Sequence, residues 1–406
     1  MTLDTHRPFI EELYRELHAS PELSLREHRT AARMAELLRE AGFEVHEQVG
    51  TATGVVGVLR RGRGPTVLLR ADMDGLPVTE VEQVPYRSTV VDELAGAPVG
   101  VMHACGHDTH MASLHGALRI LADQEDWSGT IIAVFQPAEE TMDGALGMQD
   151  ALRELFPDRI DIALGQHVMP EAAGTVLTAG GPVMAASDHF VVTVRGRGGH
   201  GSQPEKTIDP IVLAASMVLR LQTIVSREVA PSDQAVLTIG TFHAGTRQNI
   251  IPETARFEIN IRTFDDRVRT RMIAAIERIV QGECAAAGAP AATIETGERA
   301  PLTINDRDAA TAVGAAFDDV FGDRHVPQTP LLGSEDFNYL PDTWGAPSVY
   351  WFYGGFDPQL VAEATARGTA DADVPSNHSP DFIPVLQPTL DTATTAMVTA
   401  ARAFLA

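Results

Sequence analysis

The strongest constraint on the fold is the alternation of short apolar runs with helical segments in the first part of the chain. Helical periodicity covers 26–41 and stops at Gly42, a residue type that favours the position just after a helix. Apolar runs and helical segments then alternate, with runs at 55–59, 66–70, 130–135 and 160–167 and helical segments at 111–122 and 145–155. Since apolar strands that alternate with helices are typical of a mostly parallel sheet covered by helices, the sequence predicts an α/β domain.

The pattern changes at about residue 184. Strands with alternating polarity at 189–195, 235–242 and 256–263 follow, together with a short strand near 292–295 and helices at 208–224 and 267–287. The order strand–helix–strand–strand–helix–strand predicts a small ferredoxin-like α+β sandwich. The earlier pattern returns from about residue 303, and a final helix is predicted at 387–405. We therefore expect one α/β domain, formed by 1–184 and 303–406, which is interrupted by an inserted domain at 185–302.

Charge and hydropathy exclude several classes of protein. The chain has 31 Lys and Arg against 55 Asp and Glu, a formal net charge of −24. Because such a chain repels phosphate backbones and anionic lipid surfaces, we expect neither a nucleic acid nor a membrane as partner. No apolar run is long enough for a transmembrane helix, and the amphipathic, acidic start MTLDTHRPFIEELYRELH does not resemble a signal peptide. With only Cys105 and Cys284, both expected as thiols, the sequence predicts a cytoplasmic globular protein.

A cluster of histidines marks the first candidate site. Four of the fourteen histidines lie in 103–115 (HACGHDTHMASLH), where Cys105 and His107 are separated by one residue. Thiolate and imidazole are preferred ligands of zinc and other borderline transition-metal ions. The alternative is a buried apolar thiol, which is the commoner fate of an isolated cysteine and the one we expect for Cys284. Cys105 and His107 are therefore candidate metal ligands.

Two adjacent carboxylates, Glu139 and Glu140, follow the predicted strand at 130–135 in the motif QPAEE. Neighbouring side chains at a strand end point in different directions, so one carboxylate can bind a metal ion while the other takes a proton from a metal-bound water. An isolated Glu–Glu pair is also common on solvated surfaces. The position at the carboxyl end of a parallel strand favours a site, because the sites of α/β proteins gather there.

Further candidates lie at predicted strand ends and in loops. Asp72 and Asp74 follow the strand at 66–70, His167 ends the strand at 160–167, and His378 lies in the loop SNHSPDF before the last helix. A lone histidine is more often a structural residue than a ligand. Together with the two motifs above, however, these positions make five in one α/β domain, and such a set of N, O and S ligands suits one or two divalent ions with an open position for water.

The inserted domain carries its own candidates. The stretch 196–201 (GRGGHG) formally fits G-x-G-x-x-G after a strand, but two prolines follow where a nucleotide-binding helix would have to begin. We therefore reject nucleotide binding and expect the glycines to turn the backbone sharply and present His200. Asn249 in RQNIIP and Arg262 in INIRT are polar residues in an otherwise alternating domain, and an edge turn and a solvated strand face explain them equally well.

The motifs RADMDGLP, MHACGHDTH, QPAEE, GQHVMP, GGHGSQP, TIDPI, QNIIP, GSEDF and NHSPDF occur in this order. In this combination the chain resembles the amidohydrolases related to hippurate hydrolase, which include the plant auxin–amino-acid conjugate hydrolases and the bacterial N-acyl-amino-acid aminoacylases, within the aminoacylase-1/carboxypeptidase metallohydrolases. The resemblance runs from about residue 10 to the C-terminus. It implies hydrolysis of the amide bond of N-acyl amino acids, such as hippurate-like or N-acetyl-amino-acid-like substrates.

The resemblance also implies the parts of a catalytic site in the α/β domain. Two divalent ions per subunit (zinc, manganese, cobalt or nickel) are expected on the ligands Cys105, His107, Glu140, His167 and His378. Glu139 would be the general base, and Asp74 matches the acid that orients the site in relatives. Asp72 stands where other branches have a histidine ligand, so we do not count it as a ligand.

For the inserted domain the resemblance implies a lid through which the protein forms a homodimer or a tetramer. His200 matches a lid histidine that polarises the scissile carbonyl, in its own subunit or in the partner's. Asn249 and Arg262 match lid residues that hold the substrate carboxylate.

Two departures from the family pattern bear on substrate preference. The family often has G-x-x-P-H after the GGH motif, whereas here Pro204 is followed by Glu205. It often has two adjacent histidines in the last motif, whereas here Asn377 precedes His378.

Two alternatives remain at this stage. One is a dipeptidase or an N-carbamoyl-amino-acid hydrolase on the same scaffold. The other is a metal-binding homologue without catalysis, and Glu139 argues against it, because such a protein has no use for a base beside the ligand Glu140.

Overall fold

The computed structural model describes residues 2–81 and 84–406, which form two compact units. The α/β unit comprises Met1–Val183, Ile304–Thr329 and Asp336–Ala406. The inserted unit comprises Met184–Thr303 and the short segment Pro330–Glu335. That short segment falls within the stretch that the sequence pattern assigns to the α/β domain.

Eight strands within the described residues form the central sheet of the α/β unit. They are β1 (Glu44–Glu47), β2 (Val55–Arg61), β3 (Thr66–Asp72), β6 (Gly129–Gln136), β7 (Ile162–Ala172), β8 (Val176–Thr178), β17 (His325–Pro327) and β18 (Ser348–Phe356). Their order is β1-β2-β6-β3-β7-β18-β8-β17. The central run β6-β3-β7-β18 is parallel, whereas β2 pairs antiparallel with β6 and β1 pairs antiparallel with β2. The predicted mostly parallel sheet is confirmed.

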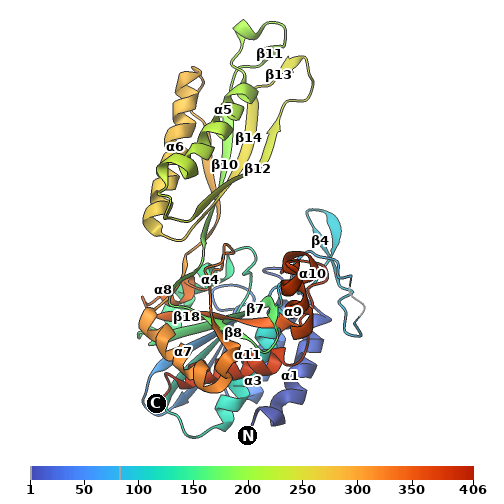
Figure 1. The fold of residues 1–406 in the computed structure, drawn as a ribbon, viewed down its shortest axis with the longest axis vertical. Coiled ribbons are helices and arrows are strands. Elements are labelled where there is room, and N and C mark those ends of the chain that lie inside the picture. Colours follow the sequence, from blue (N-terminus) through green and yellow to red (C-terminus); the bar gives the residue numbers. More distant parts are fainter. Residues whose placement is uncertain (1, 82–83) are drawn as a thin grey trace. The chain divides into compact units, whose positions relative to one another are not determined.

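Helices cover both faces of this sheet, in the α/β layering that the alternating pattern predicts (Figure 1). One face is covered by α1 (Leu3–His18), α2 (His28–Glu40), α3 (His107–Asp123), α7 (Arg307–Phe321) and α11 (Thr389–Arg402), which share one apolar core with alternate residues of β3 and β6. The other face carries α4 (Gly144–Leu155) and the short α8 (Tyr339–Asp342). The remaining elements of the unit are β4 (Val91–Leu94), β5 (Ala97–Gly100), β9 (Gly181–Met184), β16 (Thr303–Asn305), α9 (Pro358–Arg367) and α10 (Ala370–Asp373).

The inserted unit, in which every residue is described, is a ferredoxin-like sandwich. Its main elements are β10 (Ala186–Arg195), α5 (Pro210–Thr223), β12 (Ala235–Ala244), β14 (Thr254–Thr263), α6 (Asp266–Ala286) and β15 (Thr293–Ala300). The sheet has the order β12-β14-β10-β15 with antiparallel neighbours. Both α5 and α6 lie on one face and share an apolar core with it (Figure 1). At one end of the sheet, β11 (Gly199–His200) pairs with β13 (Ile250–Ile251).

The predicted boundaries differ most from the structure at three elements. α3 begins at His107 rather than at residue 111, because the left-handed Gly106 (φ 82°) turns the chain into the helix and its polar first turn is buried. β7 continues beyond His167 to Ala172, because it stays paired with β18 there. β15 extends to Ala300 because it pairs with β10 along most of its length.

One apolar helical stretch in the inserted unit, Pro210–Glu228, is long and apolar enough to cross a membrane by length and composition alone. Core helices of globular proteins pass the same test. In this structure Leu213, Met217 and Leu221 of the stretch are buried in the sandwich core, which is the pattern of a helix covering one face of a sheet.

Candidate metal centre

The carboxyl ends of neighbouring parallel strands bring the candidate residues of the α/β unit together. β3 and β6 end at the same level, since Asp72 lies opposite Gln136, and Glu139 follows three residues later. The parallel register of β3 and β7 places His167 at the level of Asp72. The first residue of α3 is His107. This edge of the sheet is where α/β folds place their ligand sites.

All five predicted metal ligands lie in one cluster of overlapping triads. The triad Cys105, His107 and His167 and the triad Cys105, Glu140 and His378 each hold their donor atoms within 4.8 Å of one another. The Cys105 Sγ atom lies 3.4 Å from His167 Nε2, and His378 Nε2 lies 3.4 Å from a Glu140 carboxylate oxygen. The sulfur of Cys105 belongs to both triads, so it occupies the middle of the cluster.

Neighbouring oxygen atoms direct the histidine rings into the cluster. His107 Nδ1 lies 3.2 Å from Asp74 Oδ1, and His167 Nδ1 donates to the carbonyl oxygen of Val168 at 2.7 Å. In both rings Nε2 therefore faces the other donors. A carboxylate or carbonyl behind each ring is the usual support of metal-binding histidines, because it fixes the ring orientation and the tautomer.

A second row of buried residues supports His167. His110 Nδ1 donates to Asp72 Oδ1 at 2.5 Å, and His110 Nε2 accepts the backbone N–H of Val168 at 2.9 Å. Asp72 also accepts from Arg70 at 2.6 Å. The Asp72 carboxylate thus accepts from Arg70 and His110. Burial opposes its ionisation, but the Arg70 guanidinium and the neighbouring His107 and His110 rings hold its pKa well below the usual range.

The backbone amides of Glu139 and Glu140 are both bound to the Asp74 carboxylate. The N–H of Glu139 donates to Asp74 Oδ1 at 3.2 Å and the N–H of Glu140 donates to Asp74 Oδ2 at 3.1 Å. Glu139 is only 5% exposed, and its carboxylate lies 3.8 Å from His107 Nε2. Glu139 therefore borders the cluster from a fixed position.

The electrostatics of the cluster fit a cation. Burial raises the pKa of the Cys105 thiol well above its usual value, and the Glu140 and Glu139 carboxylates add to this. Burial also raises the pKa of Glu140 to about 7, although His107 opposes it. Burial and the neighbouring His110 lower the pKa of His167. A divalent ion among these atoms would favour thiolate, carboxylate and neutral imidazole, which are the metal-binding forms.

Buried donor atoms without partners support the same conclusion. Within the described residues, His107 Nε2 and Glu140 Oε1 are buried and make no hydrogen bond. Such atoms cost free energy unless a partner satisfies them. The soft and borderline donor set of one sulfur, three imidazoles and one carboxylate suits a transition-metal ion.

The inserted unit brings His200 and Asn249 together. The two-stranded β11–β13 pair joins their segments, and the N–H of Gly201 donates to the carbonyl oxygen of Asn249 at 2.9 Å. His200 Nδ1 accepts the backbone N–H of Ser202 at 3.1 Å, so the neutral ring carries its proton on Nε2. Both His200 and Asn249 are exposed.

Arg262 does not join that pair within one subunit. It lies on β14 opposite Ser187, whereas the β11–β13 pair lies beyond the other end of β14, at Thr254. Eight residues of strand separate Thr254 from Arg262, which is roughly 26 Å at about 3.3 Å per residue. Arg262 is half-buried, its Nε donates to Asn260 Oδ1 at 2.8 Å, and burial lowers its pKa.

Comparison with known proteins decides the family. The family model for peptidase family M20/M25/M40 matches residues 68–370. The chain belongs to this family. That match covers β3, α3, β6 and β7, which supply most of the cluster.

Three relatives resemble this chain over most of their length. Thermostable carboxypeptidase 2 of Saccharolobus solfataricus is 39% identical over 350 residues, which are 85% of this chain and 86% of that protein. Hippurate hydrolase of Campylobacter jejuni is 40% identical over 335 residues, 81% of this chain and 84% of that protein. The crystal structure of Bacillus subtilis YxeP, a dinuclear metal-binding peptidase of the M20 family, is 27% identical, covers 98% of this chain and 99% of that one, and gives a TM-score of 0.78.

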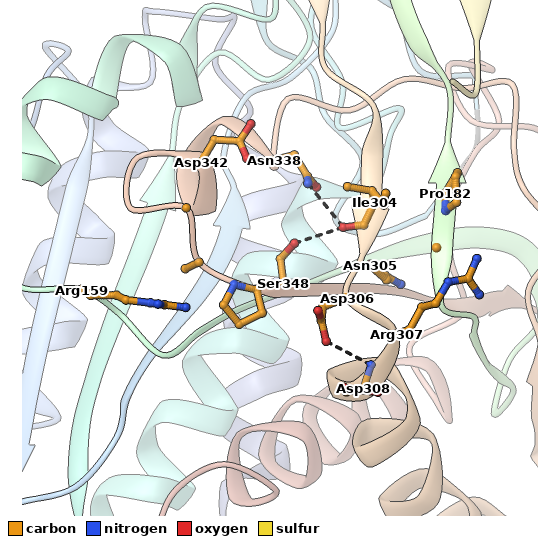
Figure 2. Close-up of a pocket in the computed structure, with 14 residues that line it drawn as sticks. Arg159, Pro182, Ile304, Asn305, Asp306, Arg307, Asp308, Asn338, Asp342 and Ser348 are labelled. Atoms are coloured by element: carbon orange, nitrogen blue, oxygen red, sulfur yellow. Dashed lines mark hydrogen bonds between the residues drawn. The ribbon is translucent and has the colours of Figure 1, made fainter. Parts of the chain in front are cut away.

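The α/β unit of this M20 family member also has a large open cavity away from the cluster (Figure 2). Its volume is about 800 Å³, and Arg159, Arg307 and Asp342 are among its lining residues. Asp306 at its wall accepts from the N–H of Asp308 and so caps α7. None of the predicted site residues lines it.

Sequence reasoning missed several buried partners of the cluster. Ser24 donates to Asp74 Oδ2 at 2.7 Å, and His18 Nδ1 lies 2.6 Å from Asp108 Oδ2. His110 was part of the histidine cluster that the sequence showed, but its link to Asp72 depends on the pairing of distant segments. The signal in the sequence that could have indicated these partners is the run of polar residues at the start of α3, which the structure shows to be buried.

Proposed function

We propose that the protein hydrolyses the amide bond of N-acyl amino acids with the help of two divalent metal ions, releasing a carboxylic acid and a free amino acid. The observation that carries this proposal is the convergence of five metal donors with the additional carboxylate of Glu139 at one edge of the sheet. A site that only stored metal would need the donors and not the extra carboxylate.

The donor cluster divides naturally between two ions. Cys105, His107 and His167 would hold one, and Cys105, Glu140 and His378 the other. Bound ions would supply Lewis acidity, which polarises an amide carbonyl and makes a coordinated water acidic near neutral pH. Zinc, manganese, cobalt and nickel all accept this donor set, and availability decides among them.

Glu139 is the proton carrier in this proposal. Its buried carboxylate takes the proton from the attacking water and later gives it to the leaving amine, so that a free amino acid departs. Asp74 fixes the position of Glu139 through the backbone and orients His107 at the same time. The general base and a metal ligand therefore share one support.

His200 supplies the second polar contact to the reacting carbonyl. Because its Nδ1 accepts from Ser202, its Nε2–H is free to donate to the oxygen on which negative charge develops. Asn249 lies next to it and is suited to contact the substrate carboxylate through its amide. Arg262 lies roughly 26 Å along the strand from the pair His200 and Asn249, so we assign this pair and Arg262 to different sites of an assembly and propose that the pair serves the partner subunit.

If His200 and Asn249 serve a partner subunit, the protein must associate with a second copy of itself, and the inserted unit has a suitable surface. α5 exposes Val212 (67%) and Leu219 (74%), which are seven residues apart and share a helix face. β12 is an edge strand that exposes Phe242. We propose a homodimer through this surface, with a tetramer as the alternative.

A cytoplasmic location fits the thiol chemistry. Cys105 and Cys284 are both free, and a thiolate ligand must stay reduced to bind metal.

Peptide substrates are the second candidate class. The 39% identity to a thermostable carboxypeptidase is the observation that favours them, since a carboxypeptidase also cleaves an amide next to a free amino-acid carboxylate. A dipeptide differs from an N-acyl amino acid by its free α-amine, and an N-carbamoyl amino acid differs by its ureido group.

The experiment is amine release from a substrate panel. Metal-stripped protein receives one divalent ion at a time and is offered N-acetyl, N-benzoyl and long-chain N-acyl amino acids, a dipeptide and an N-carbamoyl amino acid. We expect metal-dependent release from the acyl series. Release from the dipeptide or the carbamoyl compound alone would move the function to the alternative class, and no release with both ions bound would favour a non-catalytic protein.

A further inference from the structure

The loop that carries Glu139 has a strained backbone held by two buried carboxylates. Ala138 has φ 51°, a left-handed conformation that costs free energy in a residue with a Cβ. Three successive amides follow one another here. The N–H of Ala138 donates to Glu27 Oε1 at 2.9 Å, and the next two amides, those of Glu139 and Glu140, donate to Asp74.

The carbonyl of Ala138 is held as well. It accepts the N–H of Gly144, the first residue of α4, at 3.1 Å. A side chain at Gly144 would meet the Pro137 carbonyl oxygen at 1.6 Å, so the chain is closely folded against itself at this point. Both peptide groups of the left-handed Ala138 are therefore held by partners: Glu27 accepts from the first, and Asp74 and the Gly144 amide bind the second.

Glu27 reaches the Ala138 amide from outside the metal cluster. It lies just before α2, is completely buried, and comes from a part of the sequence 111 residues away. Its Oε1 also accepts the N–H of Leu25 at 2.9 Å, and its Oε2 accepts from the Thr53 hydroxyl at 2.9 Å. Burial raises the pKa of Glu27 to about 7, and the Asp74 carboxylate adds to this, so a neutral amide of the same shape can replace it.

We propose that Glu27 is a positioning residue for the reaction, which holds the Ala138 peptide in its left-handed conformation and so directs the Glu139 carboxylate at the metal cluster. The Glu27 carboxylate accepts hydrogen bonds from Leu25, Thr53 and Ala138, none of which is a candidate metal ligand. Its role rests on the proposed function, since Glu139 is the base of that function, but the shape of the loop can be measured without catalysis.

The test compares Glu27→Ala with Glu27→Gln. Alanine leaves the Ala138 N–H without its partner, whereas glutamine offers Oε1 to the amides and its NH₂ to the Thr53 oxygen. Hydrogen exchange of the peptide covering 137–142 is followed by mass spectrometry in metal-free and metal-loaded protein. We expect exchange at Ala138 to be at least about tenfold faster in Glu27→Ala, with Glu27→Gln close to the wild type.

Kinetics provide the second readout. For Glu27→Ala we expect kcat on an N-acyl amino acid to fall by about 10- to 100-fold, with KM nearly unchanged and both metal ions retained, and for Glu27→Gln we expect most of kcat to return. Glu22→Ala is the matched control. Glu22 also accepts backbone amides, those of Arg29 and Thr30 at the start of α2, but does not touch the loop.

Each outcome decides the proposal. Unchanged exchange at Ala138 in Glu27→Ala would overturn it, as would a Glu22→Ala variant that loses as much kcat as Glu27→Ala. A wild-type protein that is silent on every N-acyl amino acid would overturn the proposed function instead, and the exchange comparison would still decide whether Glu27 holds the loop.

Discussion

His107 and Asp74 share one short contact, 3.2 Å between Nδ1 and Oδ1, and the same carboxylate accepts the backbone amides of Glu139 and Glu140. One buried side chain thus orients a metal ligand and fixes the loop of the general base. Ser24 completes its partners by donating to Oδ2 at 2.7 Å. Although burial opposes it, the contact with His107 keeps the pKa of Asp74 below its usual value, so the group stays charged and accepting.

Asp74→Asn should impair metal binding and catalysis together. An amide offers one accepting oxygen and presents an NH₂ group to donors that need an acceptor, so we expect a loss of about 10- to 100-fold in metal affinity and in kcat/KM. Isothermal titration calorimetry measures the metal affinity, and steady-state kinetics measure kcat/KM. Asp161→Asn is the control, because Asp161 accepts a backbone amide at the opposite end of β3. Loss of activity with full metal affinity would contradict the shared role.

Glu139→Gln should separate metal binding from turnover. The amide cannot take a proton from water, and general base catalysis contributes about 10²- to 10⁴-fold, so kcat should fall by that factor. Metal content measured by mass spectrometry should stay at the wild-type value, because Glu140 and the other donors remain. Turnover near the wild type would remove Glu139 from the mechanism.

Cys105→Ala should lower the metal stoichiometry of the protein. The Cys105 sulfur belongs to both triads, so its loss weakens both ion sites. Cys284→Ala is the matched control, since Cys284 is a buried thiol in the apolar core of the inserted unit. Metal content after dialysis distinguishes the two. Equal metal retention in both variants would show that Cys105 is not a ligand.

His115 should make the fold sensitive to acid. It is buried against Phe135, and burial lowers its pKa from 6.5 to about 3, with Arg119 adding to this. The unfolded chain therefore binds a proton that the folded chain refuses, so stability is complete above pH 6.5 and falls as the pH drops toward 3.

At pH 5.5 this term amounts to about 1.4 kcal/mol of unfolding free energy. Urea unfolding at pH 7.5 and 5.5 measures it as the difference in pH dependence between the wild type and His115→Gln, which does not titrate. The same pH dependence in both proteins would contradict the burial of a neutral imidazole.

Leu219→Glu should dissociate the proposed homodimer. A buried charge at an apolar contact is unfavourable, and sedimentation velocity should show a monomer with strongly reduced activity, because His200 would no longer reach the partner site. Val320→Glu, at an exposed apolar residue of α7, is the control and should leave the assembly unchanged. An active monomer would contradict the assignment of His200 to the partner subunit.

Local patterns predicted β2, β3, β6 and β7 of the central sheet, the four strands of the inserted sheet and the candidate donor residues, because each of these signals lies within a few consecutive residues. They did not predict β1, β8, β17 and β18, which complete the central sheet. The apolar run at 130–135 became β6, and the carboxylates that follow it lie at the site. The start of α3 was missed because its polar first turn is buried, so no amphipathic pattern marks it. Contacts such as that of Glu27 with Ala138 join segments 111 residues apart, and nothing in either segment identifies its partner.

The sequence also did not show that Asn249 and Arg262 lie far apart. Both are polar residues in alternating segments, and only the antiparallel register of β14 with β10 shows that they belong to opposite ends of the sheet. A resemblance that groups residues by role does not say which subunit supplies each.

The central claim is that metal held by these donors drives amide hydrolysis. The most direct test titrates metal-stripped protein with a divalent ion while bound metal and amine release from an N-acyl amino acid are recorded together. We predict that activity is absent without metal and reaches its maximum as binding saturates at two ions per subunit. Full activity in the stripped protein, or saturation of the site without any amine release across the acyl series, would contradict the account.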